Sequence, residues 1–356
     1  MKTPYGLLSV CVSLFVSGCG AGLPPIADCE AGSGMTPDCR FQNPEDLAVA
    51  PDGERLIVSQ MGQMDGSKPG NLALYQPGGD IDLLFPANGV DDERSWGEAD
   101  CPTPDLAAFS PHGIDLVQRA DGRWMLLVVN HGGRESVEFF EVLGAQADTS
   151  LVWRGCAEGP ENVAFNDVAG RADGGFYVTH MFPLDGQTFA LLKGAVFGSD
   201  TGHVYDWQPV GGWSVVPGSE GPFPNGIALA EDGQSLYVNM YLAGEVRKLD
   251  LPSGKTAAIY SGGSPDNSTW ASDGRLLVAT HTGGLSDGMS CQGLESGSCA
   301  MAFNIVSLDP EDLSAIPVVS HEGPPMGAAT VALEHNGQLY LGTYAGDRIT
   351  RLALPE

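Results

Sequence analysis

Residues 45–59 read EDLAVAPDGERLIVS: a short apolar segment, an Asp-Gly pair and a second apolar segment. This pattern predicts a β-hairpin in which both turn residues take positive φ. The unit recurs five more times along the chain. The other copies are IDLVQRADGRWMLLVV at 114–129, VAGRADGGFYV at 168–178, IALAEDGQSLYV at 227–238, STWASDGRLLV at 268–278 and VALEHNGQLYL at 331–341.

The spacing of these turns predicts the fold class. They begin at Asp52, Asp121, Asp173, Asp232, Asp273 and Asn336, with separations of 69, 52, 59, 41 and 63 residues. Each interval leaves room for two more strands, and no long helical pattern interrupts the repeat. We therefore expect an all-β, six-bladed β-propeller of four-stranded blades. A β-sandwich is the competing fold, but a sandwich does not repeat one hairpin with the same landmarks. The propeller is expected at residues 41–356, after a tether and small disulfide loop at 19–40.

A ring of polar residues is predicted at one end of the central channel. The first strand of each blade runs beside the axis, so residues at one distance before the turns should meet there. Seven residues before the turns stand Glu45, Asn166, Asn225, Asp266 and Ala329, and the longer arm of the second blade places His112 nine before its turn. The next residues are Asp46, Gly113, Asp167, Gly226, Asn267 and Thr330.

Oxygen ligands in this number favour calcium. Without a cation, so many acids would raise one another's pKa. A hydrogen-bonded plug of amides and water is the alternative interpretation. Magnesium retains more water than such a cage allows, and zinc prefers histidine and cysteine ligands.

Three histidines return to the same end on the second strand of their hairpins. His131 lies ten residues after Asp121, so it should neighbour His112. By the same count His281 returns beside Asp266, and His180 returns beside the Asn166-Asp167 pair; both are expected in a substrate pocket. In a pair of histidines beside a metal, one can act as base while the other orients it and shares its proton.

The charge of the chain excludes one class of partner. Asp and Glu number 45 against 17 Lys and Arg, a formal charge of −28. Nucleic-acid binding needs clustered basic residues, so we expect no nucleic-acid partner. The acidity also raises the local concentration of cations.

The N-terminus resembles a bacterial lipoprotein signal. Lys2 precedes a short apolar run at 7–16, and VSGC ends at Cys19. We expect residues 1–18 to be removed and Cys19 to be acylated, giving an exported, membrane-anchored protein that faces the periplasm or the cell exterior. An ordinary signal peptide is the alternative. No second long apolar run follows, so the lipid is the only expected membrane contact, and we expect a monomer.

An exported chain meets an oxidising compartment, so its remaining cysteines are candidates for disulfides. These six are Cys29, Cys39, Cys101, Cys156, Cys291 and Cys299. Spacing favours Cys29–Cys39 and Cys291–Cys299 as local loops and leaves Cys101–Cys156. None stands in a CxxC pair, which argues against metal binding by cysteine.

Several short motifs, in order, resemble the paraoxonase (arylesterase/lactonase) family over residues 40–350. They are PEDL at 44–47, SPHGI at 110–114, LVVNH at 127–131, FNDV at 165–168, PNGI at 224–227, DN at 266–267 and LYLGT at 339–343. The wider six-bladed superfamily, which includes gluconolactonases and strictosidine-synthase-like proteins, shares the calcium ring but not the PHGI and VNH motifs.

The resemblance implies two calcium ions and a histidine base. A catalytic ion would be held by Glu45, Asn166, Asn225, Asp266 and Asn267. A structural ion would be held by Asp46, Asp167 and the backbone carbonyl of Ile114. His112 would be the general base, His131 its partner and His281 part of the pocket wall.

The chain also departs from the family pattern. No cysteine follows Cys299 to bridge the N-terminal segment to the last blade. The Cys291–Cys299 insertion is particular to this chain, and residues 183–202 do not clearly resemble the family's lid.

These features predict a calcium-dependent hydrolase of small esters, with lactones foremost. Water activated by His112 would attack a carbonyl polarised by the metal, with direct attack by Asp266 as an alternative. A second hypothesis is a non-catalytic, lipid-anchored binding propeller that uses calcium only for stability. A third is a sugar lactonase of the gluconolactonase kind, in which loss of His131 should leave the rate untouched.

Overall fold

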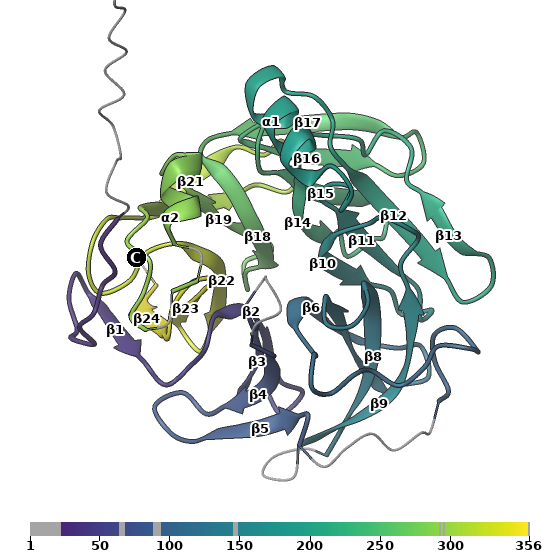
Figure 1. The fold of residues 1–356 in the computed structure, drawn as a ribbon, viewed down its shortest axis with the longest axis horizontal. Coiled ribbons are helices and arrows are strands. Elements are labelled where there is room, and N and C mark those ends of the chain that lie inside the picture. The colour runs from purple at the N-terminus through teal and green to yellow at the C-terminus, as the bar shows by residue number, and fades with distance from the viewer. Residues whose placement is uncertain are drawn as a thin grey trace, which may run out of the picture.

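Six antiparallel sheets of four strands surround a central channel in the computed structural model (Figure 1). The structure describes residues 23–63, 68–87, 94–144, 149–291, 293–294 and 296–354. The predicted six-bladed propeller is confirmed. The signal segment and Cys19 lie outside the described residues.

The blades follow one another along the chain. Blade 1 comprises β2 (Pro44–Val49), β3 (Leu56–Gln60), β4 (Asn71–Tyr75) and β5 (Ile81–Phe85), and blade 2 comprises β6 (Pro111–Gln118), β7 (Trp124–Asn130), β8 (Ser136–Leu143) and β9 (Ser150–Glu158). Blade 3 comprises β10 (Phe165–Gly170), β11 (Phe176–His180), β12 (His203–Gln208) and β13 (Gly212–Val215), and blade 4 comprises β14 (Pro224–Leu229), β15 (Ser235–Met240), β16 (Glu245–Asp250) and β17 (Lys255–Ser261). Blade 5 comprises β18 (Ser264–Trp270), β19 (Leu276–His281), β20 (Phe303–Leu308) and β21 (Ala315–His321), and blade 6 comprises β22 (Ala329–His335), β23 (Gln338–Thr343), β24 (Ile349–Ala353) and β1 (Met35–Asp38).

The repeated turns form the predicted hairpins by a different geometry from the one expected. Only Asn336-Gly337 has positive φ at both residues; in the five Asp-Gly turns the glycine alone is left-handed. In each of those five, the aspartate accepts a hydrogen bond from the backbone N–H two residues on, as Asp52 does from Glu54 at 2.8 Å. Aspartate therefore stabilises these turns through its side chain rather than through its own φ.

Every innermost strand contains a β-bulge near its start. The register with its hairpin partner shifts between Pro44 and Asp46 in β2, and between Pro111 and Ile114 in β6. The other four inner strands, β10, β14, β18 and β22, shift at the corresponding places. These are the positions of the predicted polar ring. A bulge re-aims side chains, so the ring owes its geometry to irregular backbone.

The ring of blades closes non-covalently. β1 pairs with β24 and becomes the outer strand of blade 6. Arg348, fully buried, donates to the carbonyl oxygens of Asp28, Pro325 and Ile26. Residues 35–38, which lie before the boundary predicted at residue 41, thus supply the outer strand of the last blade.

Six apolar clusters hold the blades together, one at each interface between neighbours. Between blades 1 and 2, for example, Phe85, Phe109 and Phe140 pack edge to face. Such pairs add to the stabilisation from burial alone. The cysteines pair as their spacing predicts: Cys29–Cys39, Cys101–Cys156 and Cys291–Cys299.

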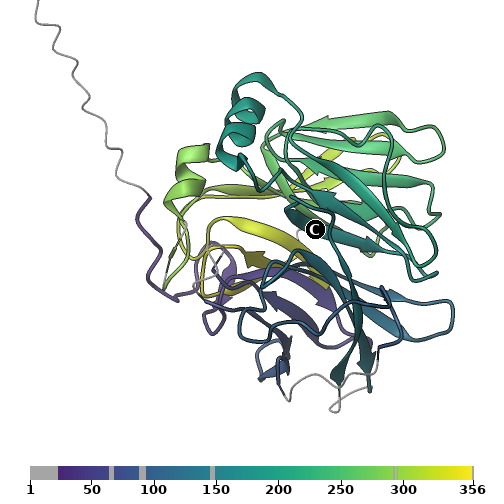
Figure 2. The same cartoon turned by 45° about the vertical axis from the view of Figure 1, so that its right-hand side comes forward.

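Two helices lie outside the sheets of the described residues, α1 (Gln187–Phe197) and α2 (Leu285–Ser290) (Figures 1 and 2). Neither helix was predicted from the sequence. Within the described residues, no helix is both long and apolar enough to span a bilayer.

Candidate active site

The predicted ring lines the base of a pocket of about 520 Å³ between α1, α2 and the inner strands. Glu45, His112, Asn166, Asn225 and Asp266 come from β2, β6, β10, β14 and β18, one from each of the first five blades, and all five line the pocket. Thr330 of β22 completes the circle. The structure therefore brings together residues that lie up to 285 positions apart.

Four buried oxygen atoms of this ring share one property: among the described residues, none has a hydrogen-bond donor. They are Glu45 Oε2, Asn166 Oδ1, Asn225 Oδ1 and Asn267 Oδ1. Leaving a buried acceptor unpaired costs about 1–3 kcal/mol. Four such acceptors at one place indicate a missing electropositive partner.

The environment of the ring also disfavours the charged form of its carboxylates. Burial, followed by the charges of Asp46 and Asp266, raises the pKa of Glu45 well above its ordinary value. Burial raises the pKa of Asp266 to about 8. The Glu45 carboxylate is partly stabilised by a hydrogen bond that its Oε1 accepts from Asn267 Nδ2 at 2.8 Å. A cation among these groups would remove both the repulsion and the cost of burying charge.

The donor set fits calcium. Carboxylate and amide oxygens are its usual ligands, and five side chains with such oxygens meet at the base of the pocket. Glu45, Asn166, Asn225, Asp266 and Asn267 would hold the ion. Asn267 lies behind the pocket surface and reaches the ring through Glu45.

His112 stands at the edge of this ring. Its Nε2 lies 3.7 Å from Glu45 Oε1 and 3.4 Å from Asn166 Nδ2. Burial, with a smaller effect of His131, holds the pKa of His112 well below its ordinary value. His112 is therefore neutral near pH 7, with a nitrogen facing the pocket.

His131 is the neighbour that the sequence predicts. Its Nε2 lies 2.7 Å from Nδ1 of His112, and its Nδ1 lies 2.8 Å from Glu135 Oε1. Burial lowers the pKa of His131, but the charge of Glu135 and the hydrogen bond to it outweigh burial and raise the pKa above its ordinary value. Glu135 was not predicted, although its place four residues after a histidine is visible in the sequence.

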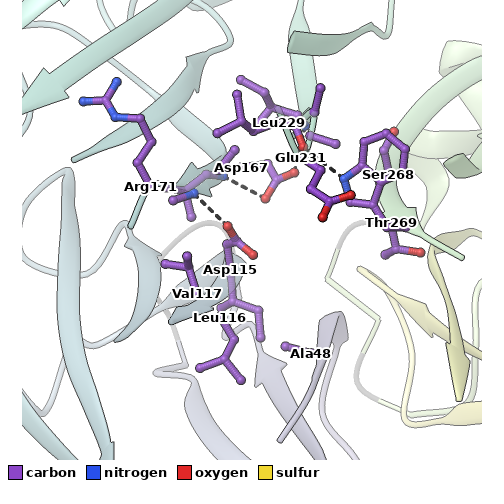
Figure 3. Close-up of a pocket in the computed structure, with 18 of the residues that line it drawn as sticks. Ala48, Asp115, Leu116, Val117, Asp167, Arg171, Leu229, Glu231, Ser268 and Thr269 are labelled. Carbon is purple, nitrogen blue, oxygen red and sulfur yellow. Dashed lines mark hydrogen bonds between the residues drawn. The ribbon is translucent and has the colours of Figure 1, made fainter. Parts of the chain in front are cut away.

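A second polar group lies one residue farther along the same strands and faces the other end of the channel. Asp46, Ile114 and Asp167 line a cavity of about 690 Å³ there, together with Asp115. Figure 3 shows the carboxylates of Asp115 and Asp167 pointing toward its centre. Asp115 was not predicted, because nothing marks its position as part of the channel until the bulge in β6 is known.

The lower carboxylates tie neighbouring blades together. Asp46 Oδ2 accepts from Ile114 N, Asp167 Oδ2 accepts from Ile227 N, and Asp115 Oδ2 accepts from Gly170 N. Burial raises the pKa of Asp46 to about 7 and that of Asp115 to about 6. Ile114 thus meets Asp46 through its N–H group. These acids have no cationic partner among the described residues, and carboxylates so placed suit a second buried ion.

The other two predicted pocket histidines have different outcomes. His281 lines the pocket, with Nδ1 3.0 Å from the Tyr241 hydroxyl and 3.6 Å from Asp266 Oδ2. His180 does not line the pocket. Its Nδ1 lies 3.3 Å from the carbonyl oxygen of Ala164, and its ring packs against the ring of His203.

The upper wall of the pocket is apolar. Its side chains include Met61, Met181, Phe182, Leu191, Leu192, Ala195, Phe223 and Leu242. Helix α1 supplies Leu191, Leu192 and Ala195, so the segment whose sequence did not resemble the family's lid still covers the pocket.

Comparison with known proteins places this geometry in a family. A family model described as Arylesterase matches residues 44–348. No curated protein matches the chain.

Solved structures share the fold at low identity. A gluconolactonase of Xanthomonas campestris is 16% identical, with 93% of this chain and 95% of that chain covered and a TM-score of 0.51. A luciferin-regenerating enzyme is 13% identical, with 90% and 95% covered and a TM-score of 0.53. A calcium-binding protein, regucalcin of Agrobacterium tumefaciens, is 13% identical, with 87% and 89% covered and a TM-score of 0.51. Because the family model spans most of the propeller, the chain belongs to the arylesterase family.

Proposed function

We propose that this chain is a calcium-dependent hydrolase of carboxylic esters, acting foremost on lipophilic lactones and aryl esters. The observation that carries the proposal is a set of four buried oxygens, without donors among the described residues, at or just behind the base of an apolar pocket and beside a neutral histidine. Membership of the arylesterase family supports a lactonase or esterase type of hydrolase.

The metal would supply electrostatic catalysis. Bound among Glu45, Asn166, Asn225, Asp266 and Asn267, calcium would polarise the ester carbonyl and stabilise negative charge on its oxygen. We also propose a second, structural ion at Asp46, Asp167 and the carbonyl of Ile114.

The protein's own groups would move the proton. His112 accepts a proton at Nε2 from water as the water oxygen attacks the carbonyl carbon. The bond to the leaving oxygen then breaks, and that oxygen takes a proton back from His112. His131 holds the imidazole of His112 in place at 2.7 Å and shares its positive charge. The apolar wall, with Phe182 and Phe223, holds the substrate and excludes bulk water.

The same wall argues against the sugar lactonase, and His112 argues against the binding propeller. A sugar lactone carries several hydroxyl groups, each of which needs a polar partner when buried, and the upper wall supplies few. A calcium-stabilised binding propeller has no need of a neutral histidine whose nitrogen faces the pocket. Direct attack by Asp266 stays a variant of the mechanism, although its raised pKa reduces the fraction of carboxylate when no metal is bound.

The test compares phenyl acetate, an aliphatic δ-lactone and glucono-1,5-lactone, each with calcium and with a chelator. We expect hydrolysis of the first two, its loss on chelation and a decrease of about 100-fold or more in kcat for H112Q. H321Q is the matched control, because His321 is also buried but bonds Gly323 in blade 5, away from the pocket. Full activity of H112Q or activity that survives chelation would contradict the proposal, and a preference for the sugar lactone would favour the gluconolactonase alternative.

We further propose that the protein is exported and anchored by a lipid on Cys19. The three disulfides support an oxidising compartment such as the periplasm or the cell exterior. Labelling with a fatty-acid probe tests the anchor: C19A should lose both the label and the association with the membrane fraction. A sedimentation experiment on the same protein tests the expected monomer.

A further inference from the structure

Glu135 links the histidine pair to β10, the strand that carries the proposed calcium ligand Asn166. It stands in the turn between β7 and β8, where Gly133 with φ +77° lets the chain fold back toward His131. One carboxylate oxygen, Oε1, lies 2.8 Å from His131 Nδ1. The other, Oε2, accepts from the backbone N–H of Phe165 at 3.1 Å, directly before Asn166.

The chemistry of these contacts determines where the protons lie. A carboxylate only accepts hydrogen bonds, so His131 Nδ1 carries a proton. In neutral His131 the other nitrogen, Nε2, is then an acceptor. It lies 2.7 Å from His112 Nδ1, which must therefore be the donor. When His112 donates from Nδ1 and is neutral, its remaining nitrogen, Nε2, carries a lone pair.

That lone pair points toward the ring. His112 Nε2 lies 3.4 Å from Asn166 Nδ2, an amide group that donates, and 3.7 Å from Glu45 Oε1, an acceptor; the donor is the closer of the two, which agrees with an acceptor at this nitrogen. A general base needs this tautomer. The opposite tautomer would place a proton on Nε2 and leave no base on the pocket side.

Among the described residues, the ion-pair partner of Glu135 is His131. The adjacent Arg134 turns away and binds Glu138 at 2.8 Å. His131 is thus the charged or polar side chain that the Glu135 carboxylate meets most closely among the contacts described, and both side chains are largely buried, at 18% and 16% exposure. When His112 takes a proton and His131 shares it, Glu135 stabilises the resulting imidazolium.

We infer that Glu135 is a positioning residue that sets the tautomers of His131 and His112 and stabilises their positive charge during turnover. The inference rests on the proposed hydrolase function and deepens it: a chain of three groups, rather than two, delivers the lone pair to the pocket.

The experiment is a double-mutant cycle in the full-length protein. E135Q keeps the size of the side chain, but its single oxygen cannot accept from both His131 and Phe165. We expect kcat for phenyl acetate to fall on the order of 10- to 100-fold, with KM changed less than about twofold. In an H131Q background the same substitution should change kcat less than about twofold, because Glu135 acts through His131. E158Q, on the same blade and half exposed, should match the wild type.

A second readout does not need activity. In ¹⁵N spectra of histidine-labelled wild-type protein, assigned with H131Q and H112Q, both imidazoles should be protonated at Nδ1. E135Q should give mixed tautomers. A wild-type His131 protonated at Nε2 alone would overturn the inference, as would equal losses from E135Q in both backgrounds. If the wild type hydrolyses no ester, the proposed function fails, and the spectra still decide the role of Glu135.

Discussion

At the residue scale, the ring is marked by buried oxygen atoms that lack hydrogen-bond donors among the described residues. Four oxygens, Glu45 Oε2, Asn166 Oδ1, Asn225 Oδ1 and Asn267 Oδ1, are buried without donors from the part of the chain that the structure describes, at a cost of about 1–3 kcal/mol each. The residue types at these positions could be predicted from their distance to each turn. The orientation of each amide could not, because it depends on neighbours from other blades, such as the Asn267–Glu45 hydrogen bond.

Substitution of Glu45 by Gln tests the ring directly. The change keeps the size of the side chain and removes one charge, so the affinity for calcium should fall about tenfold or more. Calorimetric titration of the chelated protein with Ca²⁺ measures it, and saturating calcium should restore part of the activity. E54Q, on an exposed turn of the same blade, is the control. An unchanged affinity would show that Glu45 is not a ligand.

At the scale of the element, the bulge in each inner strand decides which way adjacent side chains face. Glu45 lines the upper pocket and Asp46 the lower cavity, and Asn166 and Asp167 divide in the same way. Regular alternation along a strand also places adjacent side chains on opposite faces. Here, in addition, the backbones of neighbouring inner strands approach each other closely. Gly113 follows His112 at the same level, and a Cβ there would lie 2.6 Å from the Cα of Asp167.

Alanine at Gly113 should therefore disturb the packing of β6 against β10. Forcing atoms into such a contact costs about 1–3 kcal/mol, so G113A should lower the midpoint of thermal unfolding and weaken activity through the displaced His112. Differential scanning calorimetry in calcium measures the shift. G32A is the matched control, because a Cβ there meets nothing within 4 Å. Equal midpoints for both variants would contradict the close approach.

The whole molecule depends on how the ring of blades closes. The chain lacks a cysteine after Cys299 for a covalent bridge, and β1 with the buried Arg348 replaces it. Three backbone carbonyl oxygens from two separate segments converge on this one guanidinium. A closed ring holds its first and last inner strands, β2 and β22, in contact, and with them Glu45 and Thr330.

Removing Arg348 should open this closure. R348A leaves the buried carbonyl oxygens of Asp28, Pro325 and Ile26 without their donor, so we expect a loss of about 2–4 kcal/mol in unfolding free energy. Denaturant titration gives the value. R351A, three residues farther on in β24 and exposed, should cost far less. A difference below about 1 kcal/mol between the variants would mean that strand pairing alone closes the ring.

The acidic channel also makes stability depend on pH in a direction opposite to the usual one. Burial raises the pKa of Asp46, Asp115 and Asp266 from 3.8 to about 7, about 6 and about 8. The folded protein then binds more protons than the unfolded chain, so stability falls as pH rises. This contribution is fully present below about pH 4 and is lost as pH rises through about 6 to 8.

Chelated protein should accordingly show a falling unfolding midpoint between pH 5 and 8. Added calcium should raise the midpoint most at the high end, because the ion binds the ionised acids. A fluorescence melting series at several pH values, with EGTA or with calcium, tests both trends. Magnesium serves as the comparison ion. A chelated midpoint that rises over this range would contradict the buried, metal-free cluster.

The sequence by itself determined the number of blades, the residue types of the ring and the His112–His131 pair. Each of these follows from short-range rules: a hairpin brings residues at equal distances from its turn side by side, and six similar hairpins repeat one geometry. The tertiary structure decided what depends on contacts between distant segments. β1 joins the last blade, α1 covers the pocket, His180 lies away from it, and Asp115 joins the polar groups. Backbone bulges, strand ends and partners from other blades set these positions, and none of them has a local sequence signal.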